Sequence, residues 1–361
     1  MNMSSILLAF FSSLIATILI IRFNHLHGNL TGDLDLSGPQ KFHKKTTPRI
    51  GGVSIAIGLF LAICIIPKKI PDVSLVITLF LCAIPTFLIG LSEDLTKKIG
   101  VLTRLIFIIF SASLVSYLLE IKITNLNISE VDFLLTLPLV APIFTVFAIT
   151  GLVNAYNIID GFHGLSSMVG IVALVSIAYL GFIMGDQTIV FLSLIMVAAI
   201  LGFFFLNYPN GLIFLGDSGA YIIGFWIASL SILLTHRYKE VSPWFAFLIN
   251  GYPIIETIFT IYRRKIHQNK SPGMPDGKHL HTLIYRRILA KNGVDDRLFS
   301  ANSRTAPYMW ILTTLGVVPA ILWWQSTTIL ILASIVFFFC YIWLYSSIVK
   351  FKTPKWLRVI K

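Results

Sequence analysis

Charged residues are scarce in this sequence. Asp, Glu, Lys and Arg make up 12% of its 361 residues, whereas 56% are hydrophobic and the mean hydropathy is +0.85. A soluble globular domain carries about twice that charged fraction, so the composition excludes an ordinary soluble protein. The hydrophobic blocks run to about 20 residues, enough for a helix to cross ~30 Å of hydrocarbon. Because these blocks are continuous rather than alternating, the expected fold class is all-α, a polytopic membrane helix bundle.

Cysteines are few, and internal repeats and long soluble segments are lacking. The first apolar block, 4–22, follows no basic segment and precedes no small-residue cleavage pattern, so it is expected to be a retained helix. The segment 263–306 is too short for an ordinary domain. We therefore expect one membrane domain over 1–361, with 263–306 as a cytoplasmic loop and C-terminal helices in 307–349. Three cysteines occur in apolar blocks without a pairing pattern and are interpreted as small buried hydrophobic residues: Cys64, Cys82 and Cys340.

The apolar blocks predict about eleven membrane helices. Their expected ranges are 4–22, 50–66, 74–91, 103–120, 133–153, 166–184, 188–206, 217–235, 243–262, 307–324 and 327–349. Pro138 and Pro142 interrupt the fifth helix, which membrane helices tolerate by kinking. One set of loops, with the flanking helix ends, contains 23 of the 28 Lys and Arg residues. Basic residues stay in the cytoplasm, so the N-terminus is expected outside and the C-terminus inside.

The net charge of +12 is therefore expected to form a one-sided field on the cytoplasmic face. Such a field attracts anionic membrane lipids and polyanionic substrates. Nucleic acid is not an expected partner, because the sequence contains no nucleic-acid-binding motif. Five unusual polar stretches all fall on this predicted face, which indicates that they form one site.

The stretch NAYNIIDGFHG places Asn154, Asn157 and Asp160 at three-residue intervals near the end of a helix. Such spacing spreads two amide oxygens and a carboxylate over an arc of about 120°. Gly161 and Gly164 then end the helix and allow a ligand to approach the backbone. Capping of a polar helix end is the alternative, but polar groups so close to lipid are usually functional.

Two further stretches supply acids. In FLGDSGAYIIG, Asp217 stands where a loop meets a helix, suited to an N-cap, a metal ligand or an anion site, and Phe214 is placed to stack on a base. In LSEDLTKK, Glu93 and Asp94 are adjacent and point about 100° apart on a helix. Both reach one site only if the backbone leaves the helix there, and alone they indicate a solvated helix end.

The two remaining stretches are basic. PDGKHLHTLIYRR contains His279 and His281 with Arg286 nearby. A zinc site prefers other spacings, so contacts to a diphosphate or to the membrane surface are favoured. PQKFHKKTTPRIGG carries several cations before a Gly-Gly pair that opens a helix, and a lipid-phosphate site or an interfacial anchor fits them equally well. Its candidate residues are Lys41, His43 and Arg49.

Acids with asparagine ligands indicate Mg²⁺, or Mn²⁺, and nearby cations indicate phosphate. The simplest reaction that unites them is transfer of a phosphosugar from a soluble nucleotide to a lipid phosphate, which needs mainly positioning and charge neutralisation. An ion-coupled transporter is an alternative of another class, but its acids should lie near the midplane in repeated halves. A non-catalytic scaffold would tolerate the loss of Asp217 and Asp94.

These motifs resemble the polyprenyl-phosphate N-acetylhexosamine-1-phosphate transferases of glycosyltransferase family 4. The resemblance covers residues 35–290, and NAYNIIDGFHGL and FLGDSG are its most specific parts. It implies transfer of an N-acetylhexosamine 1-phosphate from a UDP-sugar to undecaprenyl phosphate, with release of UMP. The implied setting is the inner membrane, with the active site facing the cytoplasm and a homodimer as an open alternative.

The resemblance also implies roles for individual residues. Asp217 and Asn157 would bind Mg²⁺, Asp160 and Asn154 would shape the nucleotide-sugar site, and Phe214 would lie near the uracil. The acidic pair Glu93–Asp94 would act near the metal and the lipid phosphate, with Asp160 and Asp217 as further catalytic candidates. The stretch PDGKHLHTLIYRR, 275–287, here called the histidine loop, would contact the donor.

Three departures from the family pattern matter. Glu93 replaces the first acid of an Asp-Asp pair, Arg104 takes the place of a lysine, and Thr282 replaces the final histidine of the loop. Arginine keeps the charge but does not share a proton easily. The third departure argues against the phospho-N-acetylmuramoyl-pentapeptide transferase, which stays as the alternative. It favours enzymes that prime O-antigen or other cell-envelope polysaccharides.

Overall fold

The computed structural model describes residues 3–32, 47–269, 276–289 and 301–352, and these are almost entirely helical. The one β-bridge among them joins Gly32 and Pro48. The N-terminal half contains α1 (Met3–Arg22), α2 (Asn24–Thr31), α3 (Gly51–Cys64), α4 (Val73–Thr96), α5 (Val101–Leu118), α6 (Ser129–Leu135) and α7 (Val140–Ile159). The predicted all-α class is confirmed, although the short helix α2 was not expected.

The C-terminal half continues the bundle with further helices and two π-helical turns, η1 and η2. These elements are α8 (Leu165–Ile183), α9 (Gln187–Asn207), α10 (Gly216–Arg237), α11 (Pro243–Ile249), α12 (Gly251–Tyr262), η1 (Arg263–His267), α13 (Leu280–Ile284), η2 (Tyr285–Leu289), α14 (Ala301–Leu322) and α15 (Thr327–Val349). Every predicted apolar block therefore contains a helix. Within the described ranges, nine helices are long and apolar enough to cross a membrane.

Two of the predicted spans have special shapes. The ninth is the pair α11 and α12, bent by 76°, and it would make a tenth span if counted as one. The break falls at Asn250, between α11 and Gly251 at the start of α12, and three residues before Pro253. Helix α3 has only 14 residues, about 21 Å at 1.5 Å per residue, which is shorter than the hydrocarbon layer. The total of eleven and the orientation of the termini stay predictions.

The fifth predicted helix has different bounds from those expected. Pro138 lies between α6 and α7, and Pro142 falls in the first turn of α7. A proline is tolerated there because the first N–H groups of a helix have no intrahelical acceptor. Helix α7 therefore starts at Val140 rather than 133 and runs to Ile159, so that Asn154 and Asn157 lie within its last two turns.

Other boundaries and burial predictions also changed. Helix α14 begins at Ala301, six residues before the predicted start, and the segment expected as a loop contains α13 and both π-helical turns. Of the cysteines, Cys82 is buried as expected, but Cys64 and Cys340 are exposed on the outer surface of the bundle. An apolar thiol is compatible with a lipid-facing position, so burial within protein was the wrong expectation for those two.

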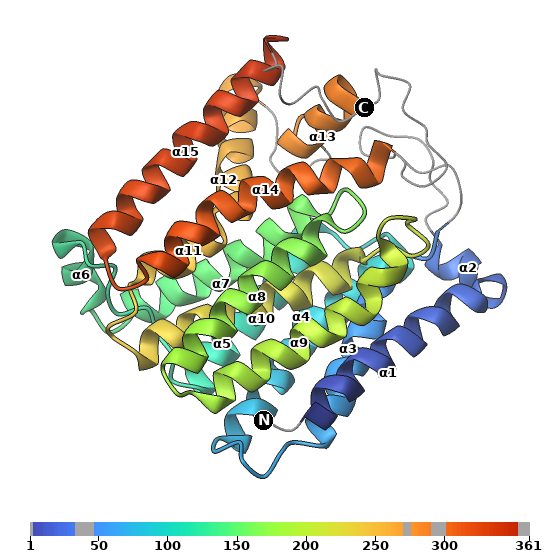
Figure 1. The fold of residues 1–361 in the computed structure, drawn as a ribbon, viewed down its shortest axis with the longest axis horizontal. Coiled ribbons are helices and arrows are strands. Elements are labelled where there is room, and N and C mark those ends of the chain that lie inside the picture. Colours follow the sequence, from blue (N-terminus) through green and yellow to red (C-terminus); the bar gives the residue numbers. More distant parts are fainter. Residues whose placement is uncertain (1–2, 33–46, 270–275, 290–300, 353–361) are drawn as a thin grey trace.

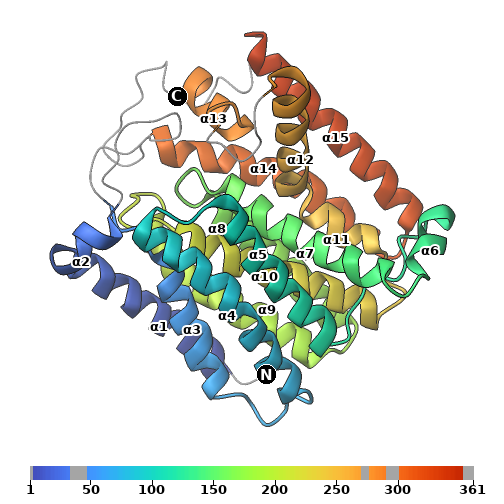
Figure 2. The same cartoon turned by 180° about the vertical axis from the view of Figure 1, so that it is seen from behind.

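Helix α10 is the centre of the bundle. In the most apolar stretch of this helix, 94% of the residues are buried. Helix α10 packs against α3, α4, α7 and α8. Figure 1 shows α10 in the middle, with α1 and α15 on opposite flanks, and Figure 2 shows the same arrangement from behind. A helix that is apolar on all sides is stable when other helices surround it. The N-terminus of α10 is therefore also surrounded by the ends of neighbouring helices.

The end of the bundle that carries the C-terminus of α10 is held by ion pairs. Arg237 contacts Asp186 and Asp72 at 2.8 Å each. The buried Asp186 also accepts hydrogen bonds from the N–H groups of Thr188 and Ile189, which caps α9. One carboxylate therefore joins the start of α9 to the end of α10.

We expect Asp186→Ala to lower the stability of the protein by about 2–3 kcal/mol, because it removes a helix cap and leaves Arg237 without one of its partners. Thermal unfolding in detergent measures the shift. Ser113→Ala is the matched control, since the exposed Ser113 hydroxyl donates only within α5, to the carbonyl of Ile109. Equal melting temperatures for the two variants would contradict the assignment.

Candidate active site

The candidate site is built on a backbone clamp between residues 48–52 and 214–219. The N–H of Phe214 donates to the carbonyl of Pro48 at 2.8 Å, and the N–H groups of Gly51 and Gly52 donate to the carbonyls of Phe214 and Leu215 at 2.9 and 3.0 Å. These bonds hold the start of α3 against the start of α10. The Gly-Gly pair and the FLGDSG motif, far apart in sequence, thus form one structural unit.

Glycines make this close approach possible. A Cβ atom added to Gly52 would lie 2.3 Å from the backbone nitrogen of Gly219, and one added to Gly90 of α4 would lie 2.7 Å from the Cα of Ser218. Gly216 has a φ of +76°, and an added Cβ would lie 2.4 Å from the carbonyl oxygen of Arg49. Three helices therefore meet at backbone contact, which only glycine permits.

Asp94 caps α10 from the neighbouring helix α4. Its buried carboxylate accepts the backbone N–H groups of Asp217 and Ser218 at 2.8 and 2.9 Å, and the Ser218 hydroxyl at 2.6 Å. A carboxylate at a helix N-terminus satisfies otherwise unpaired N–H groups and is stabilised by the helix dipole. The sequence offered Asp217 as an N-cap, but the structure gives that role to Asp94.

Asp217 instead joins two arginines. Its Oδ1 accepts from Nη2 of Arg49 and its Oδ2 accepts from Nη1 of Arg104, both at 2.5 Å. Arg49 also lies 3.5 Å from Asp94 through its Nε. Asp217 is nearly buried, whereas the two guanidinium groups are partly exposed. The cluster of Asp94, Asp217, Arg49 and Arg104, here called the arginine–aspartate cluster, balances two negative charges with two positive ones.

Among the described residues, Glu93 forms no hydrogen bond or ion pair with this cluster, although its charge acts on Arg104. Helix α4 stays helical up to Thr96, so Glu93 and Asp94 point in different directions, as adjacent helical residues must. The Oε2 of Glu93 accepts the backbone N–H of Ile99 at 2.8 Å and so fixes the turn between α4 and α5. The backbone does not leave the helix, which was the condition for both acids to reach one site.

The NAYNIIDGFHG motif contributes the end of α7. The amide of Asn154 donates to the carbonyl of Thr150 at 2.8 Å, within the helix. Asp160 follows the last helical residue, and its N–H donates to the carbonyl of Asn157 at 3.2 Å. Burial raises the pKa of Asp160 to about 8; Arg49 opposes that shift, and the nearby acids Asp217 and Asp94 add to it. Asp160 therefore belongs electrostatically to the arginine–aspartate cluster.

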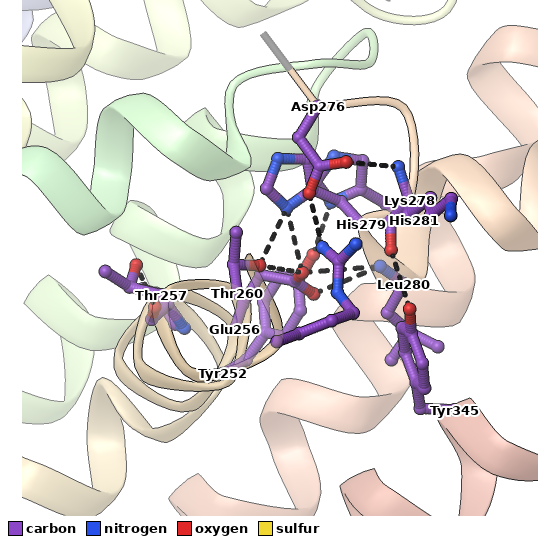
Figure 3. A network of polar contacts seen from close by, with 12 residues as sticks. Tyr252, Glu256, Thr257, Thr260, Asp276, Lys278, His279, Leu280, His281 and Tyr345 are labelled. Carbon is purple, nitrogen blue, oxygen red and sulfur yellow. Dashed lines mark hydrogen bonds and ion pairs between the residues drawn. The ribbon is translucent and has the colours of Figure 1, made fainter. Parts of the chain in front are cut away.

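The histidine loop lies against the same α7–α8 turn. A Cβ added to Gly161 would lie 3.2 Å from Nε2 of His281, and the rings of Phe162 and His281 pack edge to face with centroids 5.5 Å apart. Both histidines are buried and bonded to α12, as Figure 3 shows. Arg286 is exposed on η2 after this loop. The structure thus brings His281 against Gly161 and Phe162, the two residues that follow Asp160.

Lys41 and His43, two of the predicted substrate-binding residues, lie outside the described residues. The ring of Phe214, expected to face a base, stacks on His163 with centroids 5.8 Å apart and planes 27° apart. His163 in turn contacts the carbonyl of Pro209 through Nδ1 at 3.2 Å, which joins the α7–α8 turn to the α9–α10 loop.

Sequence reasoning missed Glu256. This acid on α12 is fully buried and contacts His279 Nδ1 at 3.0 Å. It is the single Asp or Glu in the apolar block 243–262, and an ionisable residue within a membrane helix is usually functional. That signal was available, but the block was interpreted only as a membrane span.

The described residues contain no group of three His, Cys, Asp or Glu side chains arranged to hold a metal ion. Both oxygens of Asp217 are engaged by arginines. The oxygen donors nevertheless suit a hard cation, because Mg²⁺ is usually bound by one or two carboxylates together with substrate phosphates. Asp217 would supply one such carboxylate in place of one of its two arginine contacts.

The sequence is similar to those of known proteins from one family. The profile of glycosyl transferase family 4 matches residues 76–235. The chain is 30% identical over 260 residues to the undecaprenyl-phosphate alpha-N-acetylglucosaminyl 1-phosphate transferase of Thermotoga maritima, covering 71% of this chain and 74% of that protein. It is also 30% identical over 287 residues to the probable undecaprenyl-phosphate N-acetylglucosaminyl 1-phosphate transferase of Bacillus subtilis, covering 78% and 77%.

A third relative is the undecaprenyl-phosphate alpha-N-acetylglucosaminyl 1-phosphate transferase of Escherichia coli K12, which is 27% identical over 301 residues, 79% of this chain and 78% of that protein. The matched region contains α5 to α9 and most of α4 and α10, and with them Asp94, Arg104, Asp160 and Asp217. Together with the apolar helices, these matches identify a multi-pass membrane enzyme. The chain belongs to glycosyl transferase family 4, the membrane family of sugar 1-phosphate transferases.

Proposed function

We propose that the protein transfers an N-acetylhexosamine 1-phosphate from a UDP-sugar to undecaprenyl phosphate. A lipid-phosphate oxygen forms a bond to the sugar-bearing phosphorus of the donor, and the bond from that phosphorus to the oxygen of the uridine phosphate breaks. The products are undecaprenyl-diphospho-sugar and UMP. The observation that carries the proposal is the arginine–aspartate cluster. Two partly exposed guanidinium groups are held by one nearly buried carboxylate, and guanidinium groups placed in this way suit the binding of phosphate.

Arg49 and Arg104 hold the reacting phosphates. Each guanidinium group is pre-positioned by Asp217 and partly exposed, so it can turn outward and pair with phosphate oxygens at small cost in side-chain order. Arginine suits this role because its fork of N–H groups matches two phosphate oxygens. Arginine at position 104 stays charged throughout the reaction, so it stabilises charge and does not act as a proton carrier.

Asp94 acts through position in this proposal. Its oxygens already accept three hydrogen bonds from the start of α10, so it holds Asp217 in place instead of removing a proton. The phosphate nucleophile is largely ionised at neutral pH and needs no strong base. Burial raises the pKa of Asp160, and the protonated carboxyl would donate a hydrogen bond to an oxygen of the donor.

Mg²⁺, or Mn²⁺ in its place, is part of the proposal, with Asp217 and Asn157 as the residues that would hold it. The bound ion would neutralise negative charge on the donor diphosphate. Asp217 would hold the cation in place of one of its two arginines, and that arginine would be available to the phosphates. Removal of divalent ions with EDTA is therefore expected to abolish transfer, and added Mg²⁺ is expected to restore it.

The proposed location is the inner membrane with the site at the cytoplasmic face, where positive charge gathers and nucleotide sugars are present. The proposed role is to prime O-antigen or another cell-envelope polysaccharide. The backbone clamp joins the starts of α3 and α10, which supports a site at helix ends, whereas a transporter is expected to hold its acids near the midplane. This placement favours a transferase.

A panel of donors tests the proposal. Purified protein is incubated with Mg²⁺, undecaprenyl phosphate and radiolabelled UDP-N-acetylglucosamine, UDP-N-acetylgalactosamine or UDP-N-acetylfucosamine. At least one is expected to give an extractable lipid product and an equal amount of UMP. Undecaprenol, which lacks the phosphate, is the matched control and should give none. If no donor in the panel yields product, the proposed reaction is wrong.

A further inference from the structure

Two residues of α12 bind the two histidines of the loop. Tyr252 and Glu256 are four residues apart and so lie on the same face of the helix. The hydroxyl of Tyr252 contacts Nδ1 of His281 at 2.9 Å, and Oε1 of Glu256 contacts Nδ1 of His279 at 3.0 Å. The two imidazole rings stack with centroids 5.2 Å apart and planes 16° apart. Figure 3 shows both rings beside this face of α12.

The contact with Tyr252 determines the tautomer of His281. Tyr252 is fully buried, and among the described residues its hydroxyl contacts only Nδ1 of His281. A buried hydroxyl proton must be donated, so the hydroxyl donates and Nδ1 accepts. The ring proton then sits on Nε2. Burial, together with the neighbouring His279, lowers the pKa of His281 to about 3, so the ring is neutral.

The contact with Glu256 determines the opposite arrangement in His279. Besides His279, the buried carboxylate of Glu256 contacts the hydroxyl of Tyr341 at 2.9 Å, the N–H of Leu280 at 3.3 Å and the hydroxyl of Thr260 at 3.4 Å. An ionised carboxylate only accepts hydrogen bonds, so Nδ1 of His279 must carry the proton. A carboxylate that fixes the tautomer of a catalytic imidazole in this way is a known arrangement.

We propose that Tyr252 and Glu256 are positioning residues that hold His281 and His279 in opposite tautomers, so that the loop presents one Nε2–H donor and one Nε2 acceptor to the phosphosugar half of the donor. His281 donates to a phosphate oxygen, and His279 accepts from a sugar hydroxyl or acetamido N–H. The identity of the ligand in this inference rests on the proposed function, whereas the tautomers follow from the contacts with Tyr252 and Glu256 alone.

The placement of the outer nitrogens supports this division of roles. The Nε2 atom of His281 faces the Asp160–Gly161 turn, as the short distance to a Cβ at Gly161 shows. Among the described residues, neither histidine makes a hydrogen bond through Nε2. Each ring is thus anchored to α12 through Nδ1, while its Nε2 is left without a hydrogen-bond partner among the described residues. A hydroxyl and a carboxylate on one helix can therefore set which donor groups are recognised.

Nitrogen-15 NMR of histidine-labelled protein at pH 8 tests the tautomers directly. The chain has eight histidines, and loss of signals in His279→Gln and His281→Gln assigns the two of interest. We expect His281 to show the Nε2–H tautomer and His279 the Nδ1–H tautomer. If both rings show the same tautomer, or if His279 carries two protons at this pH, the proposal is overturned whether or not the protein transfers a sugar.

Kinetics test the consequence of these tautomers for the donor. Tyr252→Phe removes the hydroxyl and frees His281 to change tautomer, so KM for the UDP-sugar should rise about tenfold while kcat changes little. In a His281→Gln background, where the amide N–H donates without help from Tyr252, the same change should have no further effect. Additive losses in the double variant would mean that Tyr252 acts only through structure.

Thr257→Val is the matched control for Tyr252→Phe. Thr257 is on the same helix, but its hydroxyl donates to the carbonyl of Pro253 within α12. The Thr257→Val variant should have the same KM for the UDP-sugar and the same histidine NMR spectrum as the unmodified protein. Glu256→Leu is the second variant, because it removes the acceptor of the Nδ1 proton and leaves the Thr260 hydroxyl, 3.2 Å from Nδ1, to donate to it, which favours the opposite tautomer. An unchanged His279 signal in a folded Glu256→Leu protein would contradict the role given to Glu256.

Discussion

Asp217→Asn is expected to lower sugar 1-phosphate transfer by about 10³-fold while the protein stays folded. The substitution keeps the shape of the side chain but removes the charge that holds Arg49 and Arg104 at 2.5 Å. The NH₂ group of the asparagine would also face one of the two guanidinium groups. Both groups are hydrogen-bond donors, so no hydrogen bond can form between them. Both arginines then lose the anchor that aims them at phosphate, and the proposed metal loses a carboxylate ligand. Initial rates with saturating donor and acceptor measure the loss.

Asp72→Asn is the matched control for this variant. Asp72 also pairs with an arginine, Arg237, but its side chain is about one-third exposed and lies at the opposite end of the bundle. Because an exposed pair contributes little, this variant should transfer sugar phosphate at the rate of the unmodified protein. If Asp217→Asn retained more than a tenth of the activity with an unchanged melting temperature, the arginine–aspartate cluster would not be the reaction centre.

The arrangement of helices could be predicted largely from the sequence, because a membrane helix requires a continuous apolar block of fixed length. The blocks at α8, α9 and α10 were placed within one or two residues. The bend between α11 and α12 could not be predicted in the same way. Gly251 and Pro253 mark a break in the chain, but the 76° angle depends on how α12 packs against α7, α14 and α15.

The residues of the site were easier to predict than their roles. The motifs identified Asp94 and Asp217, but not that Asp94 caps the helix on which Asp217 lies. That contact depends on how far α4 and α3 approach α10, which is set by tertiary contacts at Gly52 and Gly90. Glu93 illustrates the same limit, because helical phase alone separates adjacent acids but does not say which one faces the site.

Gly52→Ala is expected to cause the second large effect, a loss of about 3 kcal/mol in stability and of at least about 10²-fold in activity. The added methyl group would lie 2.3 Å from the nitrogen of Gly219 and 2.5 Å from Oγ of Ser218. Side-chain rotation can relieve the second contact but not the first, because Gly219 is backbone within α10. Helices α3 and α10 must therefore move apart, and the hydrogen bond from the Gly52 N–H to Leu215 must lengthen.

Gly151→Ala separates this packing effect from the general cost of replacing a helical glycine. Gly151 lies on α7 with no atom within 4 Å of an added Cβ, so alanine there should be neutral or stabilising by about 0.5–1 kcal/mol. Arg49 precedes Gly52 by three residues, so movement of α3 also carries its guanidinium group away from Asp217. We therefore expect the activity of Gly52→Ala to stay low even at temperatures where the variant is fully folded. Wild-type activity in a folded Gly52→Ala protein would show that the backbone clamp does not position Arg49.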